Sequence, residues 1–237
     1  MKIAIIGYGK MGKIIEQVAI KRGHQILFKF DINNQEEFTE ENLKKVDVAI
    51  EFTTPEAAYH NVKKCLEADV PVVSGTTGWL EKMEELRTMA ITHNKAFFYS
   101  ANFSIGVNVL FHINRILARI MNQFPQYEVS ITETHHIHKK DAPSGTAIKL
   151  ANDIISNLDR KNAWTMEQAT PEQLHITAIR EDEIPGIHNI VYESDFDVLE
   201  LKHSAKSREG FAVGAVMAAE FLLGKRGFFT MEDLLQF

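Results

Sequence analysis

The sequence is poor in two features that stabilise or anchor other classes of protein: cysteines and long hydrophobic runs. Cys65 is the only cysteine among 237 residues, which excludes an intrachain disulfide and a metal site built from several cysteines. The longest nearly apolar stretch, residues 211–223, is too short to span a bilayer and contains Glu220. No signal peptide is expected either, because only residues 3–6 are apolar before Gly7. These absences predict a soluble cytoplasmic protein.

An excess of positive charge is also missing. The chain has 26 basic and 32 acidic residues, a net charge of −6 with neutral histidines, so we expect no binding to nucleic acid or to an acidic membrane surface. Apolar residues make up 45% and charged residues 24%, as in ordinary globular proteins. A chain of this length can bury a large core and corresponds to between one and two domains.

The first hundred residues alternate short apolar runs with segments of helical periodicity. Runs typical of buried strands occupy residues 2–6, 25–30, 46–52, 70–73 and 96–100. Helical spacing of apolar residues occupies residues 10–21, 55–66 and 80–92. Strands that take turns with helices form a parallel sheet with right-handed crossovers. We therefore predict an α/β fold whose amino-terminal part is a Rossmann-like, doubly wound parallel sheet.

The pattern changes after Phe103. Helices are predicted over residues 107–121, 143–157 and 207–223, with a short final turn at 231–235. Strands are predicted over residues 127–133, 174–180, 188–194 and 197–203, and the polar residues 158–173 are predicted to form a loop. Consecutive strands with few helices between them indicate a second, α+β domain built on a mixed sheet.

A Gly-x-Gly-x-x-Gly set joins the first predicted strand to the first helix. It consists of Gly7, Tyr8, Gly9, Lys10, Met11 and Gly12. Such glycines allow a tight turn and let a pyrophosphate approach the N-terminus of the helix. Asp31 ends the second strand, where a carboxylate can accept hydrogen bonds from the adenosine ribose. This context favours dinucleotide binding over the alternative, a glycine turn without a ligand.

The residue after Asp31 bears on which dinucleotide binds. It is Ile32, not an arginine that would accept the extra phosphate of NADP, so NADH is favoured over NADPH. Lys10 and Lys29 could still reach a phosphate, which keeps NADPH open. Residues 75–78, Gly-Thr-Thr-Gly, follow the fourth strand at an edge where loops line the ligand crevice. By itself, that motif fits a cofactor contact and a plain turn equally well.

The densest group of reactive side chains lies within residues 135–146. Three histidines and two lysines occur within six residues: His135, His136, His138, Lys139 and Lys140. The lysines would repel a cation, so no metal site is predicted, and a solvated basic loop is the simpler alternative. Residues 143–146, Pro-Ser-Gly-Thr, indicate a helix start with an unblocked N-terminus that can hold a carboxylate. Together with a nicotinamide, these groups predict reduction of a small carboxylate substrate, with a protein group supplying the proton.

Residues 133–147, Glu-Thr-His-His-x-His-Lys-x-Asp-Ala-Pro-Ser-Gly-Thr-Ala, resemble the signature of the dihydrodipicolinate reductase family, also called 4-hydroxy-tetrahydrodipicolinate reductases. Further motifs match in order along nearly the whole chain, at residues 52–53, 75–78, 101–108 and 203–208. The resemblance implies that the cyclic dihydrodipicolinate precursor, formed from 4-hydroxy-tetrahydrodipicolinate, is reduced to tetrahydrodipicolinate by hydride from NADH or NADPH. That reaction belongs to the diaminopimelate route of lysine biosynthesis.

The resemblance also implies roles for individual residues. His135 and Lys139 match the catalytic residues that deliver the proton, and His136, Gly145 and Thr146 match positions that bind the substrate carboxylates. Besides the glycine turn and Asp31, the implied cofactor contacts are Gly75, Thr76, Thr77, Ser100, Ala101, Asn102 and Phe103. The family is a homotetramer joined through its second-domain sheets. We therefore expect residues 1–103 with 208–237 to bind the dinucleotide, and residues 104–207 to bind the substrate and to form the oligomer.

Three features depart from the family pattern. The glycine loop is one residue shorter than usual, Glu51 stands where the family usually has aspartate, and the segment between Asp31 and Val46 is trimmed. Two other hypotheses deserve comparison. Another two-domain dehydrogenase would share the Rossmann part but not the His-Lys signature, and a non-catalytic dinucleotide sensor would need His135 and Lys139 to be disabled. The intact signature favours the reductase.

Overall fold

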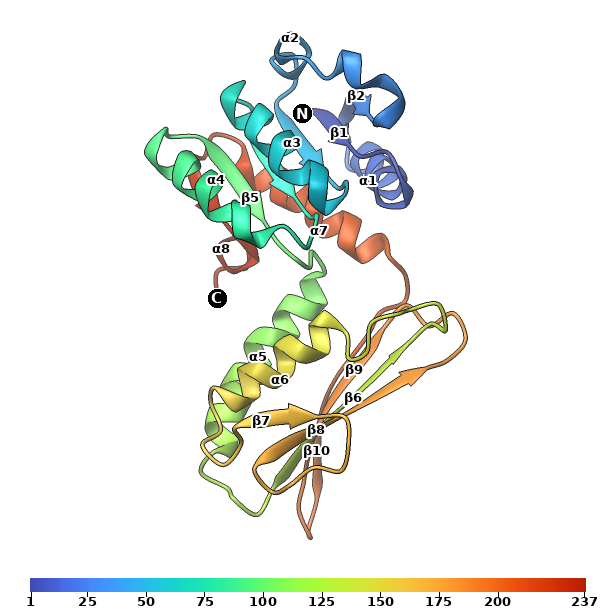
Figure 1. Ribbon diagram of the computed structural model, residues 1–237, viewed down its shortest axis with the longest axis vertical. Coiled ribbons are helices and arrows are strands. Elements are labelled where there is room, and N and C mark those ends of the chain that lie inside the picture. The colour runs from blue at the N-terminus through green and yellow to red at the C-terminus, as the bar shows by residue number, and fades with distance from the viewer. The chain divides into compact units, whose positions relative to one another are not determined.

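The computed structural model describes the whole chain, residues 1–237, which folds into two compact units. The first unit consists of Met1–Ile105 together with Glu209–Phe237, and the second consists of Gly106–Arg208. The end of the chain thus returns to the unit in which it began (Figure 1). None of the helices combines the length and the apolar character needed to cross a membrane.

The first unit is built on a six-stranded sheet in which all pairs of neighbouring strands are parallel. Across the sheet the strands are β11 (Gly227–Phe229), β5 (Ala96–Tyr99), β4 (Val72–Ser74), β3 (Val48–Glu51), β1 (Lys2–Ile6) and β2 (Gln25–Phe30). Because β2 and β3 lie on opposite sides of β1, the direction of winding reverses at this point. In such sheets a ligand binds outside the carboxyl ends of the strands at the reversal.

Helices cover both faces of this sheet (Figure 1). One face is covered by α1 (Lys10–Lys21) and α7 (Glu209–Leu222), and the other by α3 (Pro55–Glu67) and α4 (Leu80–Thr92). Three short helices complete the unit: the 3-10 helix η1 (Ile32–Glu37), α2 (Glu40–Leu43) and α8 (Met231–Leu235). Gly214, one of two glycines in α7, permits a close approach of the backbone, since a Cβ there would lie 1.8 Å from the carbonyl oxygen of Phe103.

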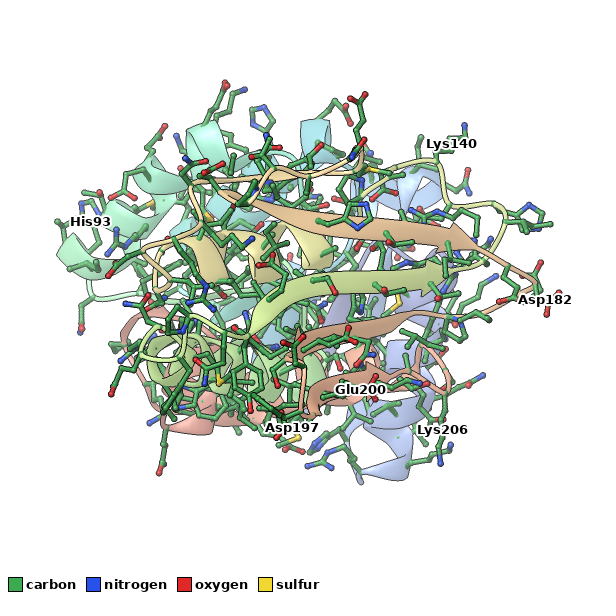
Figure 2. All side chains as sticks on the ribbon, turned by 90° about the horizontal axis from the view of Figure 1, so that it is seen from below. His93, Lys140, Asp182, Asp197, Glu200 and Lys206 are labelled. Atoms are coloured by element: carbon green, nitrogen blue, oxygen red, sulfur yellow. The ribbon has the colours of Figure 1, made fainter.

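The second unit carries a five-stranded mixed sheet. Its order is β10 (Val198–Ser204), β9 (Ile187–Glu193), β6 (Glu128–His135), β8 (Gln173–Arg180) and β7 (Ala163–Thr165). β9 runs antiparallel to both of its neighbours, whereas β6, β8 and β7 are parallel. The helices α5 (Ile105–Met121) and α6 (Gly145–Ile155) lie side by side (Figure 1) and share a core with one face of the sheet. Figure 2 shows Lys140, Asp182 and Lys206 at the end of the sheet where β6, β8 and β10 terminate.

The predicted fold class, a Rossmann-like parallel sheet followed by a mixed sheet, is confirmed. The prediction of a loop over residues 158–173 is partly wrong, because β7 forms within it and pairs with β8 at the edge of the sheet. The strand β11 is not predicted by the sequence, since three residues are too few to show a periodicity. β6 also runs on to His135, two residues past its predicted end, because polar side chains continue its inward face.

Candidate active site

The turn between β1 and α1 is packed so tightly that the fold itself requires two of its glycines. Gly7 has a φ of +92°, and a Cβ there would lie 2.1 Å from the carbonyl oxygen of Phe52. A Cβ on Gly12 would lie 2.3 Å from the carbonyl oxygen of Gly7. Gly9 differs, because it is exposed and nothing lies within 4 Å of the position of its Cβ. The space at the start of α1 is therefore open to a ligand.

A cavity of about 590 Å³ adjoins this turn, which is a size typical of small-molecule sites. Gly7, Gly9 and Asp31 line it, together with Thr53 and Lys64. Asp31 follows the last residue of β2, and its Oδ1 accepts a hydrogen bond from the backbone N–H of its neighbour in η1 at 2.7 Å. The cavity thus has the place, the size and the carboxylate that the adenosine end of a dinucleotide requires.

The side chains of the glycine turn face in different directions. Tyr8 and Met11 pack against the core, whereas Lys10 is exposed. The hydroxyl of Tyr8 donates to the carboxylate of Glu16, and Lys29 Nζ lies 2.6 Å from the same carboxylate. The hydrogen bond with Glu16 raises the pKa of Lys29. Lys29 is therefore already paired with an anion of the chain, which leaves Lys10 as the better placed of the two lysines for a phosphate.

Glu51 is completely buried at the end of β3. Its Oε1 accepts hydrogen bonds from the backbone N–H of Thr53 at 3.0 Å, from the hydroxyl of Thr53, and from the hydroxyl of Thr76 at 2.8 Å. Its Oε2 accepts from the hydroxyl of Ser74 at 2.5 Å. One carboxylate therefore connects the loop after β3 to the loop after β4, and both loops follow strands near the winding reversal.

Two loops are predicted to contact the nicotinamide end, the one after β4 and the one after β5, and hydrogen bonds within the chain hold both. Thr77 is exposed, whereas a Cβ on Gly75 would lie 2.2 Å from the ring of Phe52. The backbone N–H of Asn102 donates to Ser100 Oγ at 3.1 Å, and the Ser100 hydroxyl donates back to the carbonyl oxygen of Asn102 at 2.7 Å. These bonds fix the loop after β5.

Two further residues of the loop after β5 differ in their exposure to solvent. Ala101 is exposed, while the ring of Phe103 is buried and stacks on Phe98 with 5.9 Å between the ring centroids. The side chain of Phe103 therefore serves the core, and only its backbone is available to a cofactor.

In the second unit, the inward face of β6 changes from apolar to titratable along the strand. Alternate side chains point to the same face of a strand, so Glu133 and His135 continue the inward row of Val129 and Ile131. The register of the sheet brings His188 of β9 opposite Glu133, and Arg180 of β8 opposite His135. Side chains from three strands thus form a charged group at the end of the core. Its buried members are Glu133 and His135 of β6 and His188 of β9, and Arg180 of β8 completes it.

Charged partners set the protonation of this group. Burial raises the pKa of Glu133, but hydrogen bonds from Ser144 and Arg180 outweigh it and hold the pKa of this carboxyl below its usual value. Burial lowers the pKa of His135, and the carboxylate of Glu133 opposes that effect. Burial also lowers the pKa of His188, to about 4. At neutral pH the group therefore contains an ionised carboxylate beside two imidazoles whose neutral form is favoured by burial.

Lys139 lies in the loop after β6, where it is paired. Its Nζ is 2.8 Å from both carboxylate oxygens of Asp141, and this hydrogen bonding lowers the pKa of Asp141. His138 points to solvent and bonds to Glu183 at 3.0 Å. Of the predicted proton donors, His135 is thus buried in the charged group, while Lys139 is partly exposed beside it.

Of the predicted substrate-binding residues, Gly145 and Thr146 begin α6, whereas His136 follows the last residue of β6. Gly145 is exposed with open space around its Cβ position, Thr146 is half-buried, and His136 is half-buried with an Nδ1 that has no hydrogen-bond partner. The prediction of an unblocked helix N-terminus is partly wrong. The backbone N–H of Ser144 donates to Glu133 Oε1 at 2.9 Å, and Ser144 Oγ caps the backbone N–H three residues later. Part of the helix end is therefore occupied by a carboxylate of the chain itself.

Comparison with known proteins agrees with this geometry. Residues 1–103 match the family model described as dihydrodipicolinate reductase, N-terminus, and residues 106–235 match the one described as its C-terminus. The chain belongs to the dihydrodipicolinate reductase family. It is 46% identical over 235 residues to a 4-hydroxy-tetrahydrodipicolinate reductase of Christiangramia forsetii, covering 99% of this chain and 98% of that one. It is 35% identical to the enzyme of the same name from Caldanaerobacter subterraneus, covering 96% and 95%.

The fold also matches a solved structure of the family. A dipicolinate-bound dihydrodipicolinate reductase from Paenisporosarcina sp. TG-14 superimposes with a TM-score of 0.80 and 22% identity, and 98% of each chain is covered. The predicted family is thus confirmed over nearly the whole length of the chain.

A metal ion is a poor fit to the charged group of this family member. Glu133, His135 and His188 each offer a ligand atom, and these atoms lie within 4.8 Å of one another. However, the guanidinium of Arg180 lies 3.0 Å from Glu133 Oε1, and Lys139 also acts electrostatically on both imidazoles. The positive charge of Arg180 beside the carboxylate and that of Lys139 near the imidazoles weaken the binding of a further cation to these ligand atoms.

The sequence alone indicates no role for four residues that the structure brings into these sites: Glu51, Glu133, Arg180 and His188. Glu133 belongs to the signature, and a continued alternation along residues 129–135 would have placed it on the inward face. Arg180 and His188 come from other strands, and only the register of the sheet reveals their proximity.

Proposed function

We propose that this chain reduces dihydrodipicolinate, formed from 4-hydroxy-tetrahydrodipicolinate, to tetrahydrodipicolinate in the diaminopimelate route of lysine biosynthesis. The observation that carries the proposal is the end of β6, where His135 is buried in a charged group with Lys139 in the loop just beyond it. The names of the curated relatives and the dipicolinate bound in the related structure support a cyclic dicarboxylate as substrate.

The chain's own groups would bind the substrate and complete the reduction. When bound, the reduced nicotinamide supplies a hydride to a conjugated carbon of the ring. The electron pair displaced through the conjugated system then forms a new bond to a proton, which His135 and Lys139 would deliver. His136, Gly145 and Thr146 would hold the two carboxylates, because an imidazole and the exposed N–H groups at the start of α6 favour anions. In this proposal, the first unit binds the dinucleotide and the second binds the substrate.

The test of the function is oxidation of NADH in the presence of dihydrodipicolinate generated freshly by its synthase. We expect loss of the nicotinamide absorbance only when the synthase, its substrates and this chain are all present. Another two-domain dehydrogenase would leave NADH unchanged in this assay, and so would a dinucleotide sensor. The reaction draws on the cellular pool of reduced nicotinamide, which fits a cytoplasmic enzyme.

The cofactor preference follows from Asp31 and Lys29. Asp31 lines the cavity and would repel the extra phosphate of NADPH, while Lys29 is already paired with Glu16, so NADH is expected to bind at least as well as NADPH. Asp31→Ala is expected to weaken NADH binding about tenfold, since hydrogen bonds to a charged group are lost, and to weaken NADPH binding less. Calorimetric titration of both cofactors measures the ratio.

Glu36→Ala is the matched control for this substitution. Glu36 is an exposed carboxylate on η1, so its removal changes the net charge equally without touching the cavity. A clear preference of the unaltered chain for NADPH would contradict the assignment, and so would an equal effect of the two substitutions.

We also propose that the chain assembles as a homotetramer through the sheets of its second unit. Large apolar side chains are exposed around β10: Phe196 is 89% exposed, Val198 54% and Leu199 43%. Burying such side chains against other copies of the chain would remove apolar surface from water. Light scattering at micromolar concentration is expected to give the mass of a tetramer, and Leu199→Lys is expected to lower it. A monomer at this concentration would refute the proposed assembly.

A further inference from the structure

The two carboxylate oxygens of Glu133 have different surroundings. Oε1 accepts hydrogen bonds from the backbone N–H of Ser144 at 2.9 Å and from Arg180 at 3.0 Å. Oε2 is buried and has no hydrogen-bond partner. It faces two imidazoles, with His135 Nδ1 at 3.5 Å and His188 Nε2 at 3.7 Å. Because a buried acceptor without a donor is unfavourable, this oxygen should draw a proton-bearing nitrogen toward it.

Of the two imidazoles, His135 is the better partner. The Nε2 of His188 already lies 3.3 Å from the hydroxyl oxygen of Ser144, and burial keeps His188 neutral at physiological pH. The Nδ1 of His135 is buried and has no other partner. Ionisable groups that act on the two rings come from every surrounding segment: Glu133 on β6, Lys139 and Asp141 in the loop after it, Arg180 on β8, and His203 on β10.

We propose that Glu133 is the positioning residue for proton transfer: its Oε2 accepts a hydrogen bond from Nδ1–H of His135, fixes that tautomer, and leaves Nε2 as the nitrogen that exchanges a proton with the substrate. The surroundings of Nε2 fit this assignment. A Cβ on Gly186 would lie 3.0 Å from Nε2, so the glycine keeps space beside that nitrogen. In the step, His135 acts in its doubly protonated form: the Nε2–H bond breaks and a bond to hydrogen forms on the reduced substrate, while the Nδ1 proton stays on Nδ1 in the hydrogen bond to Glu133. The Nε2 proton is then replaced from water.

This inference rests on the proposed role of His135, and Glu133→Gln tests it. The amide removes the anion that stabilises protonated His135 and can present a donor to Nδ1. We expect kcat to fall on the order of 10²-fold, the lower range for loss of general acid catalysis. Since protonated His135 becomes less stable, its pKa falls, and the decline of kcat on the alkaline side moves to lower pH. The dissociation constant of NADH should not change.

Glu183→Gln is the matched control, because Glu183 also faces a histidine but does so in solvent. Its kcat and pH profile should equal those of the unaltered chain. If His135→Ala is inactive while Glu133→Gln keeps the normal kcat and pH profile, the positioning role is refuted and the proposed function stands. If His135→Ala retains full turnover, the proposed proton donor itself is refuted.

A measurement on the unaltered chain keeps the proposal testable should Glu133→Gln fail to fold. Long-range proton–nitrogen NMR of the histidine rings should show His135 protonated at Nδ1 in its neutral form. Protonation at Nε2 alone would overturn the proposal. Titration with Zn²⁺ supplies a second check, since micromolar binding that shifts the ring signals of both His135 and His188 would assign this group to a metal instead.

Discussion

Alanine at His135 or at Lys139 is expected to lower turnover by about 10²–10⁴-fold, the usual contribution of general acid catalysis, and to leave NADH affinity unchanged. Negative charge develops on the conjugated ring as the hydride arrives, so a nearby proton donor lowers the barrier. Both residues belong to the second unit, whereas the glycine turn and its cavity belong to the first. Steady-state kinetics, together with fluorescence titration of NADH, separates the two effects.

The same loop supplies matched controls for both substitutions. His138→Ala and Lys140→Ala remove a histidine and a lysine that are exposed to solvent, and both variants should retain normal turnover. His136→Ala should differ from His135→Ala by acting mainly on the Michaelis constant of the substrate, because it would bind a carboxylate and transfer no proton. Normal turnover in both His135→Ala and Lys139→Ala would show that the site is assigned wrongly even though the fold is correct.

The regular part of the fold could be predicted because its strands are buried on both faces. A continuous apolar run such as residues 2–6, followed by a helical stripe, identifies one unit of a parallel sheet without knowledge of its neighbours. β7 and β11 have three residues each and lie at sheet edges, so their pairing with β8 and β5 depends on tertiary contacts. Local sequence cannot carry that information.

The residues of the candidate site likewise fall into two groups: those that the sequence indicates and those that only the folded sheet brings together. His135 and Lys139 belong to one short motif, and their types and spacing alone indicate proton chemistry. The environment of His135 depends on Arg180 and His188, which lie on two other strands. A shift of one residue in the register of either strand would turn these side chains to the opposite face, so only the folded sheet shows that they meet Glu133.

Glu51 illustrates how a departure from the family pattern can be accommodated locally. The resemblance described above implies aspartate here, and glutamate is longer by one methylene group. In this chain the longer side chain reaches hydroxyl groups on both neighbouring loops, those of Thr53 and Thr76, and that of Ser74 in β4. All of these groups donate to a carboxylate that only accepts, so the buried charge is satisfied without a cation.

Glu51→Gln is therefore expected to destabilise the first unit by about 3 kcal/mol and to raise the dissociation constant of NADH. In the unaltered chain the surrounding hydroxyl groups donate to the carboxylate, and the amide of glutamine would turn N–H donors toward these same hydroxyl groups. Buried polar groups left without partners cost about 1–3 kcal/mol each. Thr53 lines the cavity and Thr76 lies in the loop predicted to contact the nicotinamide, so disorder in their loops should weaken cofactor binding. Denaturant unfolding and NADH titration measure the two effects.

Glu67→Gln, an exposed substitution at the end of α3, is the control and should change neither the stability nor the NADH affinity. Stability and NADH affinity equal to those of the unaltered chain in Glu51→Gln would mean that the two loops are held by their backbones alone.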